Sequence, residues 1–469
     1  MGAVFCFLLF LAAVGLCILL GQSLILAIWV GIAAFAALGL RRGMTVRAMW
    51  DAAWEQGRKM CCVIVIYMLI GAITALWRSA GTIAFFIYHG LRIITPQLFL
   101  LVTFLLTSFI SYALGTSFGV VGTLGVILMA LARSGGVSVA ITAGTIVAGA
   151  YFGDRCSPAS SSATLVAAAT DTKLYDNLHM MHRTGWLPYL VSLAAYAALS
   201  VTHPLAMVDS GVLDQLSGTF SLSWWTAIPA LLILILPLCK VPIRPTMAVS
   251  ALTALLVTVF AQGRALLPTL RDAVLGYLPA PGALHDVLSG GGMMSMAGIV
   301  LICYCGFSAT SIMIHAGVLD KAVEPLMRNL NSRWKTVLTA EIAIYIIHAI
   351  AGNSYVSSVF VGEAWEEGYI KNGMGRPCLS RTLEDVGTCV SCMFPWGNSG
   401  AFYATTLGVA AYGAGGYIPY TVMWWACPLF AMIWAITGIG ISKLSPDEIK
   451  AELETIQAKK DKAVSIADI

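Results

Sequence analysis

The sequence predicts an all-α polytopic membrane protein made of two inverted-topology repeats, each with a re-entrant hairpin and a broken transmembrane helix. Three observations support this prediction. Of the 469 residues, 59% are hydrophobic and 11% are charged, and apolar runs of about 20 residues, enough to span a bilayer, recur along the chain. Several of these runs are interrupted by Gly, Ser and Pro. The interruptions themselves recur at a fixed spacing.

Ten apolar stretches are expected to cross the membrane. Two of them are interrupted, by GDRCSPASSS at 153–162 and by FPWGNS at 394–399. The first stretch has no preceding Lys or Arg and no clear small-residue cleavage site, so it is expected to be a retained span rather than a signal peptide. In order, the ten stretches are 3–20, 23–40, 59–78, 137–169, 185–203, 224–239, 246–262, 294–313, 379–411 and 419–442.

Two further apolar stretches, 97–133 and 334–370, are too long for one crossing, and GTSFG and GNSYVSS break them near the middle. Irregular backbone at membrane depth persists only where protein or a wet cavity surrounds it. Each stretch is therefore expected to enter the membrane, turn at its Gly-Ser tip and return on the same side.

The basic residues predict the orientation. The loop 41–59 carries Arg41, Arg42, Arg47, Arg58 and Lys59, whereas 204–223 carries no Lys or Arg. The first is thus expected in the cytoplasm and the second outside, and the alternation of spans places the C-terminus in the cytoplasm. We expect a multi-pass protein of the cell membrane, specifically a bacterial inner membrane.

The C-terminal tail is predicted to form a short solvated helix. Ser445 is the expected N-cap, Pro446 lies in the first turn, and Glu448 follows three residues after the cap.

An internal repeat relates the two halves. Five small or special residues recur 237 positions later (352 − 115, 395 − 158): Gly115, Ser117, Phe118, Gly125 and Pro158 match Gly352, Ser354, Tyr355, Gly362 and Pro395. The first copy begins on the cytoplasmic side and the second begins outside, so the copies are expected to be inverted. The expected organisation is two transmembrane helices and a cytoplasmic loop (1–58), repeat 1 (59–203), a linker with two transmembrane helices (204–293), repeat 2 (294–442) and a cytoplasmic tail helix (443–469).

Inverted repeats with paired broken helices are typical of secondary transporters, whose sites lie near the bilayer midplane between the repeats. Helix N-termini at the breaks favour a carboxylate, and freed carbonyls and hydroxyls can ligate Na⁺ at roughly 2 to 3 Å. Na⁺ or H⁺ is the expected coupling ion, and no cofactor is expected. Na⁺ is the sole metal considered, because the CxxC at Cys389 and Cys392 has no second ligand pair. A net charge of +4 does not indicate a nucleic-acid surface, so the expected partners are membrane lipid and a small-molecule substrate.

The candidate site residues form two groups. Polar and aromatic residues at the tips and breaks are expected to bind substrate: Thr116, Ser117, Phe118, Ser160, Ser161, Asn353, Ser354, Tyr355, Trp396 and Asn398. An ionisable residue inside a membrane is a functional hypothesis by default. The carboxyls within the spans and nearby hydroxyls are therefore expected to couple ions: Asp154, Ser157, Ser357, Glu384, Asp385, Thr388 and Ser399.

Each assignment has a structural alternative. Asp154 can pair locally with Arg155 to hold the shape of the break, and Glu384 and Asp385 can bond nearby backbone or Arg381. The choice between function and packing also applies to the aromatic and histidine side chains Phe118, Tyr355, Trp396, His315 and His348.

Three motifs, in order and spacing, resemble the NhaC-type sodium/proton antiporter family of the ion transporter superfamily: FGDRCSPASSS, SRTLEDVGTCVSCMFPWGNSGAF and TLGV. The resemblance covers about residues 20 to 442. It implies paired re-entrant hairpins, a homodimer and elevator-like movement of a transport domain against a scaffold. The family includes sodium/proton exchangers, malate/lactate exchangers and proposed amino-acid carriers.

The sequence departs from this family at two acidic positions. Ser161 stands where the family typically has the aspartate of SPLSDTT, and Asn353 stands where it has that of TGDQY. A buried carboxylate is the usual device for exchanging a proton with a cation. The changes therefore favour an ion-coupled transporter of a small organic acid or amino acid, and the alternative is a Na⁺/H⁺ antiporter without an organic substrate.

Two other classes fit less well, and no enzymatic activity is expected. GTSF around Ser117 is similar to the GxSx of an intramembrane serine protease, but GNSY repeats the serine, and His179 and His182 are expected in a loop. A channel is disfavoured because paired inverted breaks without a ring of pore-lining charge indicate alternating access.

Overall fold

The computed structural model describes residues 2–59, 61–205, 210–239, 241–280, 284–316, 318–328 and 330–467. Within these ranges the chain is helical, and its β-structure is limited to two isolated bridges. Seven of the described helices are long and apolar enough to cross a membrane, or up to eight if a pair bent by 67° counts as one span. The predicted all-α polytopic membrane architecture is confirmed.

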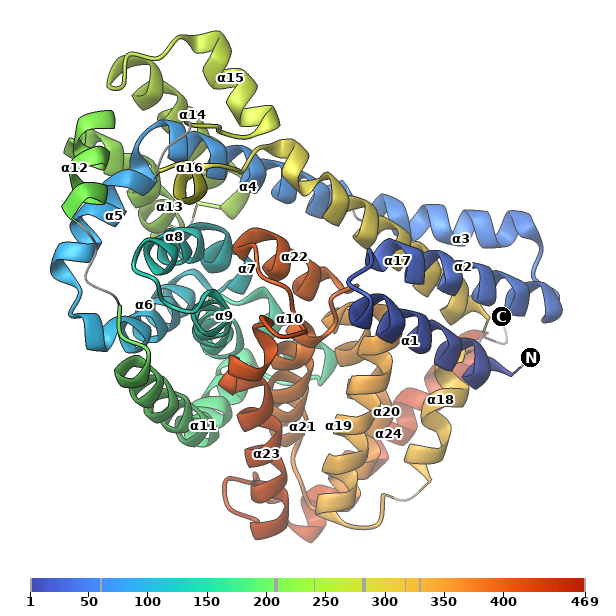
Figure 1. The fold of residues 1–469 in the computed structure, drawn as a ribbon. Coiled ribbons are helices and arrows are strands. Elements are labelled where there is room, and N and C mark those ends of the chain that lie inside the picture. Colours follow the sequence, from blue (N-terminus) through green and yellow to red (C-terminus); the bar gives the residue numbers. More distant parts are fainter. Residues whose placement is uncertain are drawn as a thin grey trace.

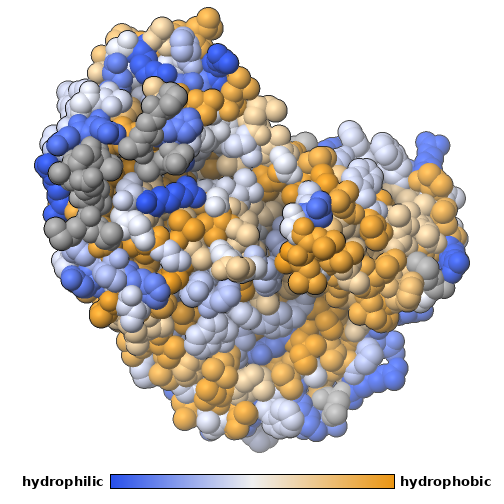
Figure 2. Space-filling model, in the orientation of Figure 1, coloured by the Kyte–Doolittle hydropathy of each residue, from blue (hydrophilic) through white to orange (hydrophobic). Residues whose placement is uncertain are grey.

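Three helices come first: α1 (Ala3–Leu19), α2 (Leu24–Arg41) and α3 (Val46–Lys59). Large hydrophobic side chains are exposed along α1 and α2, and Figure 2 shows them on the right-hand side of the molecule. The predicted loop at 41–59 is wrong, because most of it is α3. Thr45 caps this helix by accepting a hydrogen bond from the Ala48 N–H (3.1 Å), and Met49 and Ala52 are buried where α3 packs along α17.

The next segment forms eight helices, with a π-helical turn at Val121–Gly125 joining α7 to α8. They are α4 (Cys61–Ser79), α5 (Thr82–Ile93), α6 (Phe99–Leu114), α7 (Ser117–Val120), α8 (Val126–Ser134), α9 (Val139–Cys156), α10 (Ser161–Ala169) and α11 (Leu174–Thr202). The sequence analysis missed α5, which follows α4 after the 67° bend. It also began the last span at 185, although α11 starts at 174, because buried residues such as Leu178 and Met181 extend its packed face.

Helices of the second copy begin at the same places as those of the first. The helices from Ser117, Val139 and Ser161 have counterparts from Ser354, Arg376 and Asn398, each 237 residues later. The second set comprises α17 (Ala297–His315), α18 (Val318–Met327), α19 (Arg333–Ala351), α20 (Ser354–Lys371), α21 (Arg376–Thr382), a π-helical turn (Leu383–Thr388), a 3₁₀ turn (Cys389–Met393), α22 (Asn398–Leu407) and α23 (Val422–Thr437). α18, like α5, is not among the predicted elements.

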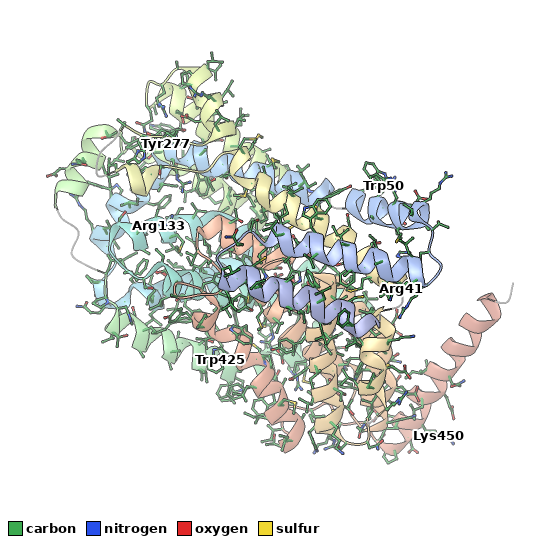
Figure 3. The ribbon with its side chains drawn as sticks, turned by 45° about the vertical axis from the view of Figure 1, so that its right-hand side comes forward. Arg41, Trp50, Arg133, Tyr277, Trp425 and Lys450 are labelled. Carbon is green, nitrogen blue, oxygen red and sulfur yellow. The ribbon has the colours of Figure 1, made fainter. Side chains whose placement is uncertain are left out.

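Short helices connect the two sets: α12 (Ser210–Thr219), α13 (Ile228–Leu238), α14 (Ile243–Phe260), α15 (Leu266–Leu275) and α16 (His285–Leu288). Figure 1 shows α7, α9, α10 and α22 near the middle of the molecule, so the segments that begin and end at the breaks lie centrally. The two sets also meet at their helix ends, where Arg133 of α8, labelled in Figure 3, donates a 2.8 Å hydrogen bond to the carbonyl of Leu407.

The tail helix α24 (Pro446–Ala467) begins as predicted. The Ser445 N–H donates to Glu448 Oε2 (2.7 Å), and the Glu448 N–H donates to Ser445 Oγ (3.3 Å), which is a reciprocal capping box. α24 lies at the edge of the molecule, where Figure 3 labels Lys450.

Candidate functional site

Each hairpin tip contacts the break that follows it in the same half of the chain. Gly115 ends α6 with φ +67°, and a Cβ there would lie 2.6 Å from the carbonyl oxygen of Ala159. Gly352 ends α19 with φ +62°, and its carbonyl accepts a 3.0 Å hydrogen bond from the Asn398 N–H. Glycine meets both demands, because it adopts positive φ and lets backbone approach closely.

The breaks are shorter than the sequence analysis expected. The first spans residues 157–160 and the second 394–397, so Asp154 lies in the last turn of α9 rather than in unwound chain. The helices restart at once because a polar side chain caps each new N-terminus. Thr116 accepts from the Gly119 N–H (3.4 Å), Ser160 from the Ala163 N–H (3.2 Å) and Asn353 from the Tyr355 N–H (2.8 Å).

Asp154 is held by hydroxyl groups. Ser117 donates to its Oδ2 at 2.5 Å, and Ser160 donates to its Oδ1 at 3.3 Å. Tyr403 of α22 donates in turn to the Ser117 oxygen at 2.9 Å. This carboxyl is thus bonded within the first half of the chain and linked through Ser117 to the second.

Glu384 is fully buried and has a similar environment. Ser162 of α10 donates to its Oε1 at 3.0 Å, and Thr388 donates to its Oε2 at 2.6 Å. The Ser162 and Thr388 hydroxyl oxygens lie 2.8 Å apart. Two carboxyls, one from each half, therefore lie among hydroxyl oxygens, which are the ligand type that hard cations prefer.

A small polar chamber of about 70 Å³ lies between these groups. Residues from both tips and both breaks line it: Thr116, Ser117, Phe118, Asp154, Ser161, Ser162, Leu165, Ser354, Tyr355, Ser358, Thr388, Ser391 and Ser399. Its volume suits an ion or a water molecule rather than an organic solute.

A larger cavity of about 430 Å³ adjoins the chamber and shares Thr116, Phe118, Ser161 and Tyr355 with it. Its other walls come from Tyr67 of α4, from Asn398 and from apolar residues of α13 and α14. Tyr67 OH donates to the side-chain oxygen of Asn398 and, at 3.2 Å, to its backbone carbonyl. Four helices begin at the two cavities, from Ser117, Ser161, Ser354 and Asn398.

Asp385 does not line the chamber but belongs to a buried ion pair. Arg155 Nη2 lies 2.5 Å from Asp385 Oδ1, and Arg381 Nε lies 3.7 Å from Oδ2. The local pair between Asp154 and Arg155, considered as an alternative from the sequence, is wrong, because the Arg155 side chain reaches across to the second half of the chain.

Four other predicted residues lie outside the lining of both cavities. Ser157 bonds the Ala159 N–H (3.1 Å), Ser357 bonds the Ser354 carbonyl (2.9 Å) and Trp396 bonds the Ala349 carbonyl (2.9 Å). The Asn353 side chain caps α20. Ser160 reaches the site through its bond to Asp154.

The sequence analysis missed Tyr67, Ser162, Ser358, Ser391 and Tyr403 at the two cavities. One signal was available, because Ser162 stands 237 residues before Ser399, which was identified. Tyr67 and Tyr403 gave no such signal.

The serine-protease alternative also needs a correction. His179 and His182 lie within the helix α11, not in a loop, and His182 Nδ1 contacts the Leu178 carbonyl at 2.7 Å. The hydroxyl of Ser117 bonds a carboxyl and a phenol, so its described partners are not those of a histidine-activated nucleophile.

Comparison with known proteins identifies the chain. The model of the Na⁺/H⁺ antiporter family matches residues 3–167 and 149–439. The chain belongs to this family. An NhaC-type Na⁺/H⁺ antiporter of Alkalihalophilus pseudofirmus is 29% identical, over 81% of this chain and 83% of the relative. A malate-2H⁺/Na⁺-lactate antiporter of Bacillus subtilis is 27% identical (88% and 89%), and an arginine/ornithine antiporter of Halobacterium salinarum is 28% identical (87% of each).

These relatives confirm the NhaC-type resemblance. Membership of the Na⁺/H⁺ antiporter family and the apolar helices together make the chain a multi-pass membrane protein. All three relatives are transporters by name, and two of them carry organic solutes.

Proposed function

We propose that the chain is a cation-coupled antiporter in which the carboxyls of Asp154 and Glu384 bind Na⁺ or H⁺ in turn. The observation that carries this proposal is the pair of carboxyls, one from each half, surrounded by the hydroxyls of Ser117, Ser160, Ser162 and Thr388. A carboxylate with hydroxyl neighbours can ligate a hard cation, and the same carboxyl takes a proton when the cation leaves. Charge at the site then stays nearly balanced in both states.

We further propose that the adjoining cavity receives a small organic solute with a carboxylate. Four helices begin at the two cavities, and each N-terminus presents N–H groups and a partial positive charge. The cavity volume of about 430 Å³ accommodates a small acid or amino acid. The names of the two organic-solute relatives support this class of substrate.

Exchange of Na⁺ and H⁺ without an organic solute is the second candidate. The 70 Å³ chamber favours it, because that space holds an ion without the larger cavity being filled. In this case the larger cavity serves as the aqueous access path to the carboxyls.

Alternating access through two inverted repeats is the proposed transport mechanism. The equal spacing of helix starts at Ser117, Val139 and Ser161 and at Ser354, Arg376 and Asn398 supports a repeated unit, and the loop charges support its inversion. The homodimer, the elevator-like movement and the cytoplasmic C-terminus remain predictions that the family resemblance and the charge pattern support.

Proteoliposomes with a trapped pH dye test the function. We expect a Na⁺ pulse to change the internal pH, and we expect one member of a panel of short carboxylates and amino acids to alter that rate and accumulate in the vesicles. A full Na⁺-driven pH change that no solute affects would establish the second candidate. No cation-dependent pH change with or without any solute of the panel would overturn the proposal.

A further inference from the structure

Two adjacent residue pairs divide their side chains in the same way. In Asp154–Arg155 the aspartate bonds the hydroxyls of Ser117 and Ser160, while the arginine points into the protein. In Glu384–Asp385 the glutamate bonds Ser162 and Thr388, while the aspartate points into the protein. The two inward side chains, Arg155 and Asp385, are ion-paired at 2.5 Å.

This ion pair is deeply buried and closely packed. The Arg155 and Asp385 side chains are 1% and 4% exposed. The guanidinium lies against Gly185 of α11, where a Cβ would stand 2.6 Å from Nη1 of Arg155. Arg381 approaches the other oxygen of Asp385 at 3.7 Å and donates to the Gly440 carbonyl at 3.3 Å. The position of Arg155 is thus fixed from both sides, by Asp385 and by α11.

A bond between residues 155 and 385 constrains residues 154 and 384, because each is joined to its neighbour by one peptide unit. The strut therefore links the backbone at the first site carboxyl to the backbone at the second, across the two halves of the chain. Groups that hold metal ligands in place change metal affinity by about 10- to 100-fold when they are replaced, although they do not contact the metal.

We propose that Arg155 and Asp385 are positioning residues, which fix the Asp154 and Glu384 carboxyls relative to each other and thereby set the cation affinity of the site. This inference rests on the proposed function and refines the expectation for Asp385. It assigns to Asp385 a partner in the protein, Arg155, in place of the coupling ion.

Length-compensated substitution provides the test. Arg155→Lys shortens one side of the strut and Asp385→Glu lengthens the other, so each single variant disturbs the spacing and the double variant restores it. In proteoliposomes we expect each single variant to raise the KM for Na⁺ by about tenfold with a smaller change in maximal rate. We expect the double variant to recover most of the wild-type KM.

Two further variants separate positioning from loss of charge. Gly185→Ala keeps every charged group but pushes on the Arg155 guanidinium, and it is also expected to raise the KM for Na⁺. Arg78→Lys is the matched control, because Arg78 is another buried arginine but donates to the Thr74 carbonyl (2.8 Å) of its own helix. It is expected to leave the KM for Na⁺ unchanged.

The outcomes distinguish this inference from the proposed function. If the wild type shows no cation-driven proton movement, the function itself is wrong. If the wild type exchanges Na⁺ and H⁺ but the single variants and Gly185→Ala keep the wild-type KM, the positioning role is wrong. If the double variant is as impaired as Asp385→Glu alone, Asp385 acts as a cation ligand and the inference is overturned.

Discussion

The hydroxyl of Ser162 donates a 3.0 Å hydrogen bond to the carboxyl of Glu384, which lies 222 residues later in the chain. Ser162 opens α10 just after the first break, and Glu384 lies in the π-helical turn that follows α21. Neither half of the chain therefore completes this site alone. The bond joins the two halves at the point where we propose that the cation binds.

Ser162→Ala tests the contribution of that hydroxyl. It removes one oxygen from the site and a hydrogen bond to a carboxylate, a type of bond worth about 1.5–3 kcal/mol. We expect the KM for Na⁺ to rise by roughly tenfold or more, since 1.4 kcal/mol corresponds to a factor of ten. Ser192→Ala is the control, because that buried hydroxyl bonds the Pro188 carbonyl within α11 (2.8 Å). Equal KM values in both variants would exclude Ser162 as a ligand.

Asp154→Asn is expected to reduce cation-driven proton movement strongly while the protein still folds. Folding is preserved because Arg155 pairs with Asp385 and does not depend on Asp154. Asparagine fits the same space and can still accept from Ser117 and Ser160, but it cannot exchange a proton. Transport and detergent-solubilised yield are measured on the same preparation, and a variant that fails to fold would contradict this account.

Asn398→Ala probes the larger cavity. Asn398 lines that cavity and accepts a hydrogen bond from Tyr67, but it is not bonded to either site carboxyl in the described structure. We expect it to weaken the effect of the organic solute on transport and to leave exchange of Na⁺ for H⁺ largely intact. Loss of both activities in equal measure would argue that one site serves ion and solute.

Asn353→Ala is expected to destabilise the protein by about 1 kcal/mol, because it removes the N-cap of α20. Asn353→Ser should restore the stability, since serine caps equally well. Thermal unfolding in detergent measures both variants. If Asn353→Ser keeps the stability but raises the KM for Na⁺ or for the solute, then Asn353 is a ligand, as the sequence analysis expected.

The two tip glycines provide a matched comparison of strain. Both have φ near +60°, where a Cβ costs about 1–2 kcal/mol. At Gly115 the Cβ would also meet the Ala159 backbone at 2.6 Å, whereas at Gly352 the nearest atom lies at 3.2 Å. Gly115→Ala should therefore lower the unfolding temperature more than Gly352→Ala. The reverse order would show that the tips do not pack on the breaks as described.

Much of the fold follows from the sequence because its signals are local. Apolar runs give most of the spans, and the Gly and Ser clusters at 115–119 and 352–358 give the hairpin tips. The helix α3 was missed because its charged residues resemble a loop. Its burial depends on contact with α17, about 250 residues later, which no local pattern reveals.

The candidate site was only partly predictable for the same reason. Asp154, Glu384 and the capping residues are visible as polar groups inside apolar runs. The partner of Arg155 was not, because proximity in sequence favours Asp154, whereas the direction of the side chain at the end of α9 selects Asp385. Tyr403 and Tyr67 look like ordinary aromatic residues of a span until the fold brings their hydroxyls to Ser117 and Asn398.

Proton release on cation binding tests the central claim most directly. Purified protein in weakly buffered detergent solution, at a pH where the site carboxyls are protonated, is titrated with Na⁺ while a pH indicator is followed. The account predicts that Na⁺ releases protons in the wild type, and that Asp154→Asn and Glu384→Gln each reduce the number released, with Arg78→Lys as the unchanged control. Saturable Na⁺ binding without any proton release in the wild type would contradict it.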